Sequence, residues 1–151
     1  MLKNILLKVS FSALLFIALT AVGYAQTSKQ HFQSNPWKED QLISPAALAG
    51  MISKKEDVKI YNIGVVQNIK GATNLGAASE AENLNKLKEI LKTTPKNKAI
   101  VIYCGCCPMD RCPNIRPAFK AFVDQDFTNV RLLELPTNIK TDWIDQGYPV
   151  D

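Results

Sequence analysis

The stretch Ala99-Ile100-Val101-Ile102-Tyr103 runs directly into Cys104-Gly105-Cys106-Cys107-Pro108-Met109-Asp110-Arg111-Cys112. A short apolar run bounded by turn-forming residues is typical of a strand that is buried on both faces of a parallel sheet. The loop after it holds all four cysteines of the chain. We therefore expect a central strand that places Cys104 at the carboxyl end of a sheet, where open α/β sheets bind their ligands.

Strand-like and helix-like segments alternate on both sides of this run. Ser44 followed by Pro45 predicts the start of a helix, because Ser is a good N-cap and Pro suits the first helical position. In the helix expected over residues 116–124, several apolar side chains should lie partly inward, namely those of Phe119, Ala121, Phe122 and Val123. The alternation predicts an α/β domain with a mostly parallel sheet flanked by helices on both faces. We expect strands over residues 58–63, 71–75 and 129–135, and further helices over residues 80–91, 116–124 and 141–146.

Residues 1–25 have the features of a cleavable secretory signal. Lys3 and Lys8 provide a positive start, an apolar run extends from residue 9 to residue 22, and Gly23 and Ala25 are the small residues that a signal peptidase requires. The run is shorter than the ~20 residues that a membrane-spanning helix needs. We expect cleavage after Ala25, export to the periplasm or the medium, and no stable membrane span afterwards. Residues 26–41 are interpreted as an N-terminal arm, and residues 42–151 as the domain.

Charge and composition exclude several classes of function. The net charge falls from +4 to +2 when the signal is removed, because the signal holds two lysines and no acidic residue. A nearly neutral chain without a basic run gives no reason to expect nucleic-acid binding. No Ser/His/Asp set can be assembled around the single histidine, His31, and the chain has no Gly-rich phosphate loop. We expect no cofactor.

The cysteine loop offers conditions that stabilise a thiolate. It connects a strand to a helix that is expected to begin near Pro113 or Asn114, so loop amides and the positive helix end favour an anion at Cys104. Arg111 and Arg116 add positive charge. The sequence thus predicts a lowered pKa for Cys104.

Residues 42–151 resemble the rhodanese domain. The segment that ends at Cys104 leads into the active loop of that family, and the segment that begins at Trp143 matches its closing W-x-x-x-G-Y-P-V pattern. Four segments in the family's order carry the resemblance: Ile43-Ser44-Pro45-Ala46-Ala47-Leu48, Ile69-Lys70-Gly71-Ala72-Thr73-Asn74-Leu75, Val101-Ile102-Tyr103-Cys104, and Trp143-Ile144-Asp145-Gln146-Gly147-Tyr148-Pro149-Val150.

The resemblance implies that Cys104 carries a sulfane sulfur as a persulfide. It implies a small sulfur donor, a thiol or cyanide acceptor, and a possible protein thiol partner. The loop backbone at Gly105, Met109 and Asp110 would surround the sulfur, with Met109 where the family has an arginine. The resemblance leaves open whether Arg111 or Arg116 replaces that arginine.

Other departures from the family pattern lie outside the cysteine loop, among them Pro136-Thr137 where the family has Gly-Gly after the last strand. Asn62-Ile63-Gly64 stands where the family has a D-x-R strand end, and Asn68 stands in place of the family's histidine. The loop itself is longer than the usual one.

Other interpretations of the four cysteines remain open. Cys106, Cys107 or Cys112 could act as a resolving thiol, or local disulfides could account for the cluster. Four soft thiolates at Cys104, Cys106, Cys107 and Cys112 also suit Cu(I), Zn or an iron–sulfur cluster. A third alternative is a catalytically inactive rhodanese-fold binding module.

Overall fold

The structure is a computed structural model that describes residues 37–151. The predicted signal, residues 1–25, and most of the predicted arm lie outside the described residues. Export and the proposed division of the chain therefore stay predictions. None of the helices between residues 37 and 151 has the length and apolar character that crossing a bilayer requires.

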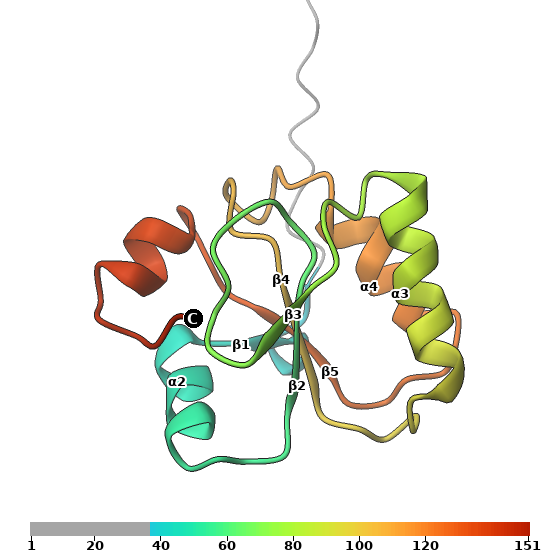
Figure 1. Cartoon of the computed structure of the whole chain (residues 1–151), viewed down its shortest axis with the longest axis horizontal. Helices are drawn as coiled ribbons and strands as arrows, with labels where there is room; N and C mark the ends of the chain where they lie inside the picture. The colour runs from blue at the N-terminus through green and yellow to red at the C-terminus, as the bar shows by residue number, and fades with distance from the viewer. Residues whose placement is uncertain (1–36) are drawn as a thin grey trace, which may run out of the picture. The chain divides into compact units, whose positions relative to one another are not determined.

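A five-stranded sheet forms the middle of the domain (Figure 1). Neighbouring strands are parallel throughout, and the order across the sheet is β1-β5-β4-β2-β3. The strands are β1 (Leu42–Ile43), β2 (Lys59–Asn62), β3 (Ala72–Asn74), β4 (Ile100–Tyr103) and β5 (Val130–Leu133).

The apolar run that ends at Tyr103 forms the central strand, as predicted. β4 lies between β2 and β5, and Ile102 pairs with Tyr61 on one side and Leu132 on the other. All four residues of β4 are at most 1% exposed. An apolar side chain at every position of β4 is required because both faces of the strand are covered.

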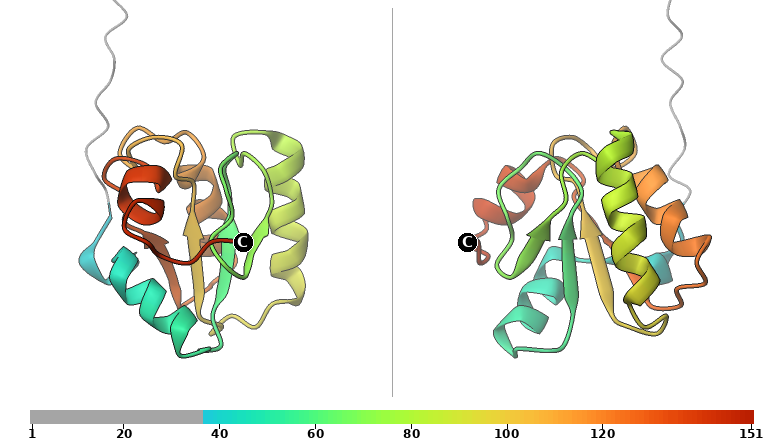
Figure 2. Two further views of the ribbon diagram at one scale, coloured as in Figure 1. Left: turned by 60° about the vertical axis from the view of Figure 1, so that its left-hand side comes forward. Right: turned by 45° about the vertical axis from the view of Figure 1, so that its right-hand side comes forward.

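Helices cover both faces of the sheet (Figure 2). The helix α2 (Pro45–Ser53) and the short π-helix η2 (Lys140–Ile144) lie on one side, and α3 (Ala81–Thr93) and α4 (Ile115–Val123) lie on the other. A short 3-10 turn, η1 (Glu39–Gln41), precedes β1. The α/β architecture expected from the alternation of elements is confirmed.

Side chains of β4 alternate between two hydrophobic clusters, one for each face. Val101 and Tyr103 belong to the cluster that contains Leu48 of α2 and Trp143 of η2. Ile102, and Cys104 just beyond the strand, belong to the other cluster. Cys104 therefore faces the side of the sheet that α3 and α4 cover.

The predicted start of α2 is confirmed. Ser44 has extended backbone angles and its Oγ accepts a hydrogen bond from the Ala47 N–H at 3.2 Å. Pro45 occupies the first helical position, where its missing N–H costs nothing.

Three of the four segments that resemble the rhodanese domain meet in space. Ile69 and Val150 form an antiparallel bridge. The Tyr103 hydroxyl accepts a hydrogen bond from the Ile69 N–H at 2.9 Å, and the Trp143 Nε1 donates to the Pro149 carbonyl at 3.0 Å. The closing segment is thus tied to the loop between β2 and β3.

The inward orientation expected for Val123 is wrong. Phe119, Ala121 and Phe122 of α4 are buried, whereas the Val123 side chain is 57% exposed. Each helical residue is rotated by about 100° from the one before it, so a fully apolar helix end cannot turn every side chain to the core. The other predicted elements are present, with ends that differ by a few residues.

Candidate functional site: the cysteine loop after β4

Cys104 is the first residue after β4, and its side chain is buried. It is 1% exposed and packs in the cluster between the sheet and the helices α3 and α4. The Asn114 Nδ2 donates a hydrogen bond to the Cys104 Sγ at 3.1 Å. Asn114 is 4% exposed, and its Oδ1 accepts from the Ser79 N–H at 2.9 Å. The Asn114 amide is therefore held at both ends and aims its N–H at the sulfur.

Three further groups donate to the same sulfur. They are the Cys112 thiol, the Cys106 thiol and the backbone N–H of Cys106. The hydrogen bond from Cys112 is the largest influence on the pKa of Cys104; burial opposes it, and Asn114 and Cys106 reinforce it. Together these donors lower the pKa of Cys104 from the ordinary 9.0 to about 5. The lowered pKa expected from the sequence agrees with this geometry.

The neighbouring thiols keep their protons at neutral pH. Burial and the hydrogen bonds with Cys104 and Cys107 raise the pKa of Cys106 to about 12. The hydrogen bond with Cys104, followed by burial, raises the pKa of Cys112. One negative charge shared among these three thiols therefore lies on Cys104, because the other two act as its proton donors.

The four thiols are all free, and they lie close together. The Sγ of Cys106 is 3.2 Å from that of Cys104 and 3.4 Å from that of Cys107. The sulfurs of Cys104, Cys106 and Cys112 lie within 4.8 Å of one another. Cys104 and Cys112 are buried, whereas Cys106 is exposed. The cluster thus reaches from the core to the surface.

Glycines at two positions allow the backbone to approach the sulfur closely. A Cβ at Gly64 would lie 2.6 Å from the Cys104 carbonyl oxygen and 2.9 Å from its Sγ. Gly105 has a φ of +74°, and a Cβ there would lie 2.8 Å from the Ile139 Cβ. A larger residue at either position would displace the cysteine loop.

Asn62 and Asn68, two departures from the family pattern, are hydrogen-bonded to each other. The Asn62 Nδ2 donates to the Asn68 Oδ1 at 3.0 Å and to the Val66 carbonyl at 2.8 Å. The Asn62 Oδ1 accepts from the Gly64 N–H at 3.0 Å. The side chain of Asn62 is fully buried, so it organises the loop that lies against Cys104.

The two candidate arginines differ in their surroundings. The Arg116 Nη1 donates to the Asp110 carbonyl oxygen at 3.3 Å, and its Nη2 is buried without a hydrogen-bond partner among the described residues. The Arg111 side chain is 62% exposed and its Nε lies 3.8 Å from the Asp110 Oδ2. Met109 is 6% exposed and belongs to the hydrophobic core.

Sequence reasoning missed two residues of this site. Asn114 was expected only as a possible helix start, and Gly64 only as a departure from the family pattern. Neither has a signal in a single sequence, because Asn is common at helix starts and Gly in loops. Their contacts with Cys104 depend on how distant segments pack.

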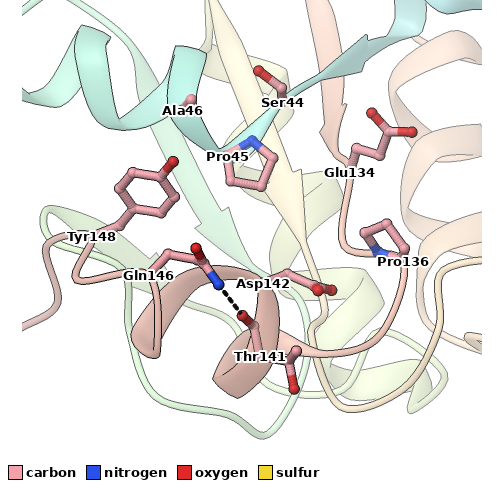
Figure 3. Close-up of a pocket in the computed structure, with 9 residues that line it drawn as sticks. All are labelled: Ser44, Pro45, Ala46, Glu134, Pro136, Thr141, Asp142, Gln146 and Tyr148. Carbon is pink, nitrogen blue, oxygen red and sulfur yellow. Dashed lines mark hydrogen bonds between the residues drawn. The ribbon is translucent and has the colours of Figure 1, made fainter.

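A surface pocket of about 370 Å³ lies elsewhere, between the start of α2, the end of β5 and η2 (Figure 3). It includes none of the four cysteines. Inside it, the Gln146 Nε2 donates to the Thr141 carbonyl at 3.2 Å. Its lining residues are Ser44, Pro45, Ala46, Glu134, Pro136, Thr141, Asp142, Gln146 and Tyr148.

Comparison with known proteins yields a structural likeness. No family model matches the chain, and no curated protein matches it. Among solved structures it is similar to a Tyr-to-Phe variant of EanB, which carries a cysteine persulfide in a tetrahedral intermediate state with ergothioneine. The TM-score is 0.51 and the identity 23%, over 72% of this chain and 27% of that chain. The fold is α/β, with an all-parallel five-stranded sheet and flanking helices, consistent with a rhodanese-like domain.

Proposed function

We propose that this protein is a sulfurtransferase that carries a sulfane sulfur on Cys104. The observation that supports this most strongly is the buried Cys104 sulfur at the carboxyl end of β4, which accepts hydrogen bonds from Asn114, Cys106 and Cys112. Such donors favour a thiolate, which is the nucleophilic form of cysteine. The fold likeness to a protein solved in a persulfide state agrees with this proposal.

The proposed reaction has two displacements at sulfur. The Cys104 thiolate attacks the sulfane sulfur of a small donor; the new S–S bond forms as the donor's bond breaks, and the leaving group takes the electron pair. With thiosulfate as donor, the leaving group is sulfite. A thiol or cyanide then attacks the outer sulfur of the persulfide, and Cys104 leaves as a thiolate.

The low pKa of Cys104 supports both displacements. It keeps the attacking cysteine ionised at neutral pH, and it makes the same sulfur a good leaving group in the second step, since thiols of lower pKa leave faster. No oxidant or reductant is consumed, because the sulfur atom passes from one nucleophile to another.

Arg116 is the arginine that we assign to an anionic donor. Its Nη2 is buried without a partner among the described residues, which is costly for a charged group unless a ligand satisfies it. Its Nη1 is anchored on the Asp110 carbonyl of the cysteine loop. Arg111, which is largely exposed, is not assigned this role.

Steady-state transfer of sulfur from thiosulfate to cyanide tests the proposal. We expect turnover in the wild type and none in Cys104→Ser, with circular dichroism showing that the variant is folded. Turnover that survives the loss of Cys104 would refute the assignment. A folded wild type that transfers no sulfur from thiosulfate or from a small persulfide donor to cyanide or a thiol would instead favour the inactive binding module.

The two arginines can be separated in the same assay. Arg116→Ala should raise the KM for thiosulfate at least tenfold, which corresponds to losing about 1.4 kcal/mol of binding. Arg111→Ala should change that KM by less than about twofold, because exposed charge contributes little. The opposite ranking would assign the donor site to Arg111.

The location of the protein and the identity of its acceptor are proposed from the sequence alone. The proposed signal over residues 1–25 would export the domain to the periplasm or the medium, and a protein thiol is one acceptor that Cys104 could serve there. Mass determination of the exported chain would test the first point, since the proposed mature protein begins at Gln26.

A further inference from the structure

We propose that Cys104, Cys106 and Cys112 form a three-thiolate binding site for Cu(I). Their sulfurs lie within 4.8 Å of one another, and those of Cys104 and Cys106 are 3.2 Å apart. Three sulfurs around one metal ion, with metal–sulfur bonds of ~2.3 Å, would be roughly 4 Å apart. The three side chains are thus close to a coordinating arrangement before any metal binds.

The donor set of this cluster is soft and contains only sulfur. Soft thiolate ligands select Cu(I), Zn or iron–sulfur clusters, whereas carboxylates suit harder ions. The nearby carboxylate of Asp110 is directed to Arg111 at 3.8 Å and is not part of the cluster. The chemistry of these residues therefore points to a soft metal ion.

The number of ligands favours Cu(I) over Zn. Structural zinc sites are almost always tetrahedral with four protein ligands. Here three sulfurs converge, while the Cys107 sulfur contacts that of Cys106 at 3.4 Å and falls outside the group of three. Three-fold coordination by thiolates is a geometry that Cu(I) readily accepts.

Burial shields the site and leaves one route into it. Cys104 and Cys112 are each 1% exposed and belong to the hydrophobic core together with Met109, whereas Cys106 is exposed. A metal ion would first meet Cys106 and then the two buried sulfurs. As it binds, the thiols of Cys106 and Cys112 release their protons to solvent, because the thiolate is the ligand form of cysteine.

Copper binding and sulfur transfer would compete for one atom. A Cys104 sulfur bound to Cu(I) cannot attack a sulfur donor, and a persulfide on Cys104 removes one ligand from the metal site. The copper proposal does not depend on sulfur transfer, because it rests on the positions of three thiols.

An anaerobic titration of the reduced full-length chain with Cu(I), in competition with a chromophoric Cu(I) chelator and without any sulfur donor, tests the site. We expect one copper per chain, and X-ray absorption should show three sulfur ligands. Cys106→Ser and Cys112→Ser should each weaken Cu(I) binding by more than about 100-fold, since even partners of ligands contribute 10–100-fold. Cys107→Ser is the matched control and should keep the affinity within about threefold.

Three results would overturn this proposal. The first is that the chelator removes all copper from the wild type. The second is that Cys107→Ser weakens binding as much as Cys106→Ser does, which would indicate a four-thiolate site. The third is tight one-to-one binding of Zn²⁺ with four sulfur ligands. The two proposals are tested independently. A protein that does not bind Cu(I) can still transfer sulfur in the thiosulfate assay, and a protein that transfers no sulfur can still bind Cu(I).

Discussion

Asn114 is the residue outside the cysteine cluster whose side chain donates directly to Cys104. Its Nδ2 lies 3.1 Å from the Cys104 sulfur, while its Oδ1 accepts from the Ser79 N–H. The amide joins the loop before α3 to the start of α4, so its orientation is set by the fold rather than by a flexible contact. A group fixed in this way stabilises the thiolate without reorganising during the reaction.

Replacing Asn114 by Ala should raise the pKa of Cys104 by about 1–2 units, because a hydrogen bond to a charged group contributes ~1.5–3 kcal/mol and one pKa unit equals 1.36 kcal/mol. The pH dependence of alkylation by iodoacetamide, with the modified cysteine located by mass spectrometry, measures this. Asn83→Ala is a matched control, because the Asn83 Nδ2 donates to the Ala77 carbonyl at 3.1 Å. An unchanged pKa in Asn114→Ala would show that the amide does not support the thiolate.

At the scale of elements, the loop after β2 packs against the cysteine loop. Gly64 allows this contact, since any Cβ there would lie 2.6 Å from the Cys104 carbonyl. Asn62, at the end of β2, holds the loop in place through hydrogen bonds to Gly64, Val66 and Asn68. The end of one strand thus supports the reactive residue at the end of the next.

Gly64→Ala should lower the free energy of unfolding by ~1–3 kcal/mol and reduce sulfur transfer, because the added methyl group overpacks the space beside Cys104. Urea denaturation measures the first effect. The contrasting variant is Gly50→Ala in α2, where a Cβ meets nothing within 4 Å. That change should stabilise the domain by ~0.5–1 kcal/mol, because Ala is a better helix residue than Gly. Equal effects of the two substitutions would contradict the close packing at Gly64.

The elements of this fold were largely predictable, because each depends on local sequence. The unbroken apolar run of β4 indicated its central place, and Ser44 with Pro45 indicated the start of α2. The short strand β1 was less evident, since two residues carry no periodicity and form a strand only by pairing with β5. The exposure of Val123 could not be predicted because it depends on where the apolar face of α4 ends.

The candidate site was predictable in position but not in its contacts. Four clustered cysteines after a buried strand indicated the loop. The residues around the Cys104 sulfur depend on segments that are far apart in sequence: Asn114 is 10 residues away, and Ser79 is a further 35 from Asn114. The sequence favoured neither Arg111 nor Arg116 as the arginine that replaces the one in the family. The hydrogen bond from Arg116 to the Asp110 carbonyl depends on how the chain packs.

At the scale of the whole domain, the ionised Cys104 links pH to stability. Its pKa is about 5 in the folded chain and 9.0 ordinarily, so folding favours the thiolate. The stabilisation from Cys104 is therefore complete above pH 9, decreases as the pH falls, and is lost as the pH passes through about 5.

Urea denaturation of the wild type and Cys104→Ser between pH 5 and pH 8 measures this linkage. The difference in unfolding free energy, wild type minus variant, should increase as the pH rises over this window. The variant is the control for the titrating groups that do not contact Cys104. A difference that stays constant with pH, or that shrinks as the pH rises, would show that Cys104 is not a stabilised thiolate.

The most direct test of the central proposal is the mass of the reduced protein after exposure to thiosulfate or a small persulfide donor. We predict an increase of about 32 Da, the mass of one sulfur atom, that fragmentation locates on Cys104 and that cyanide removes. Unchanged mass, or an added sulfur located on another cysteine while Cys104 stays unmodified, would contradict the proposal.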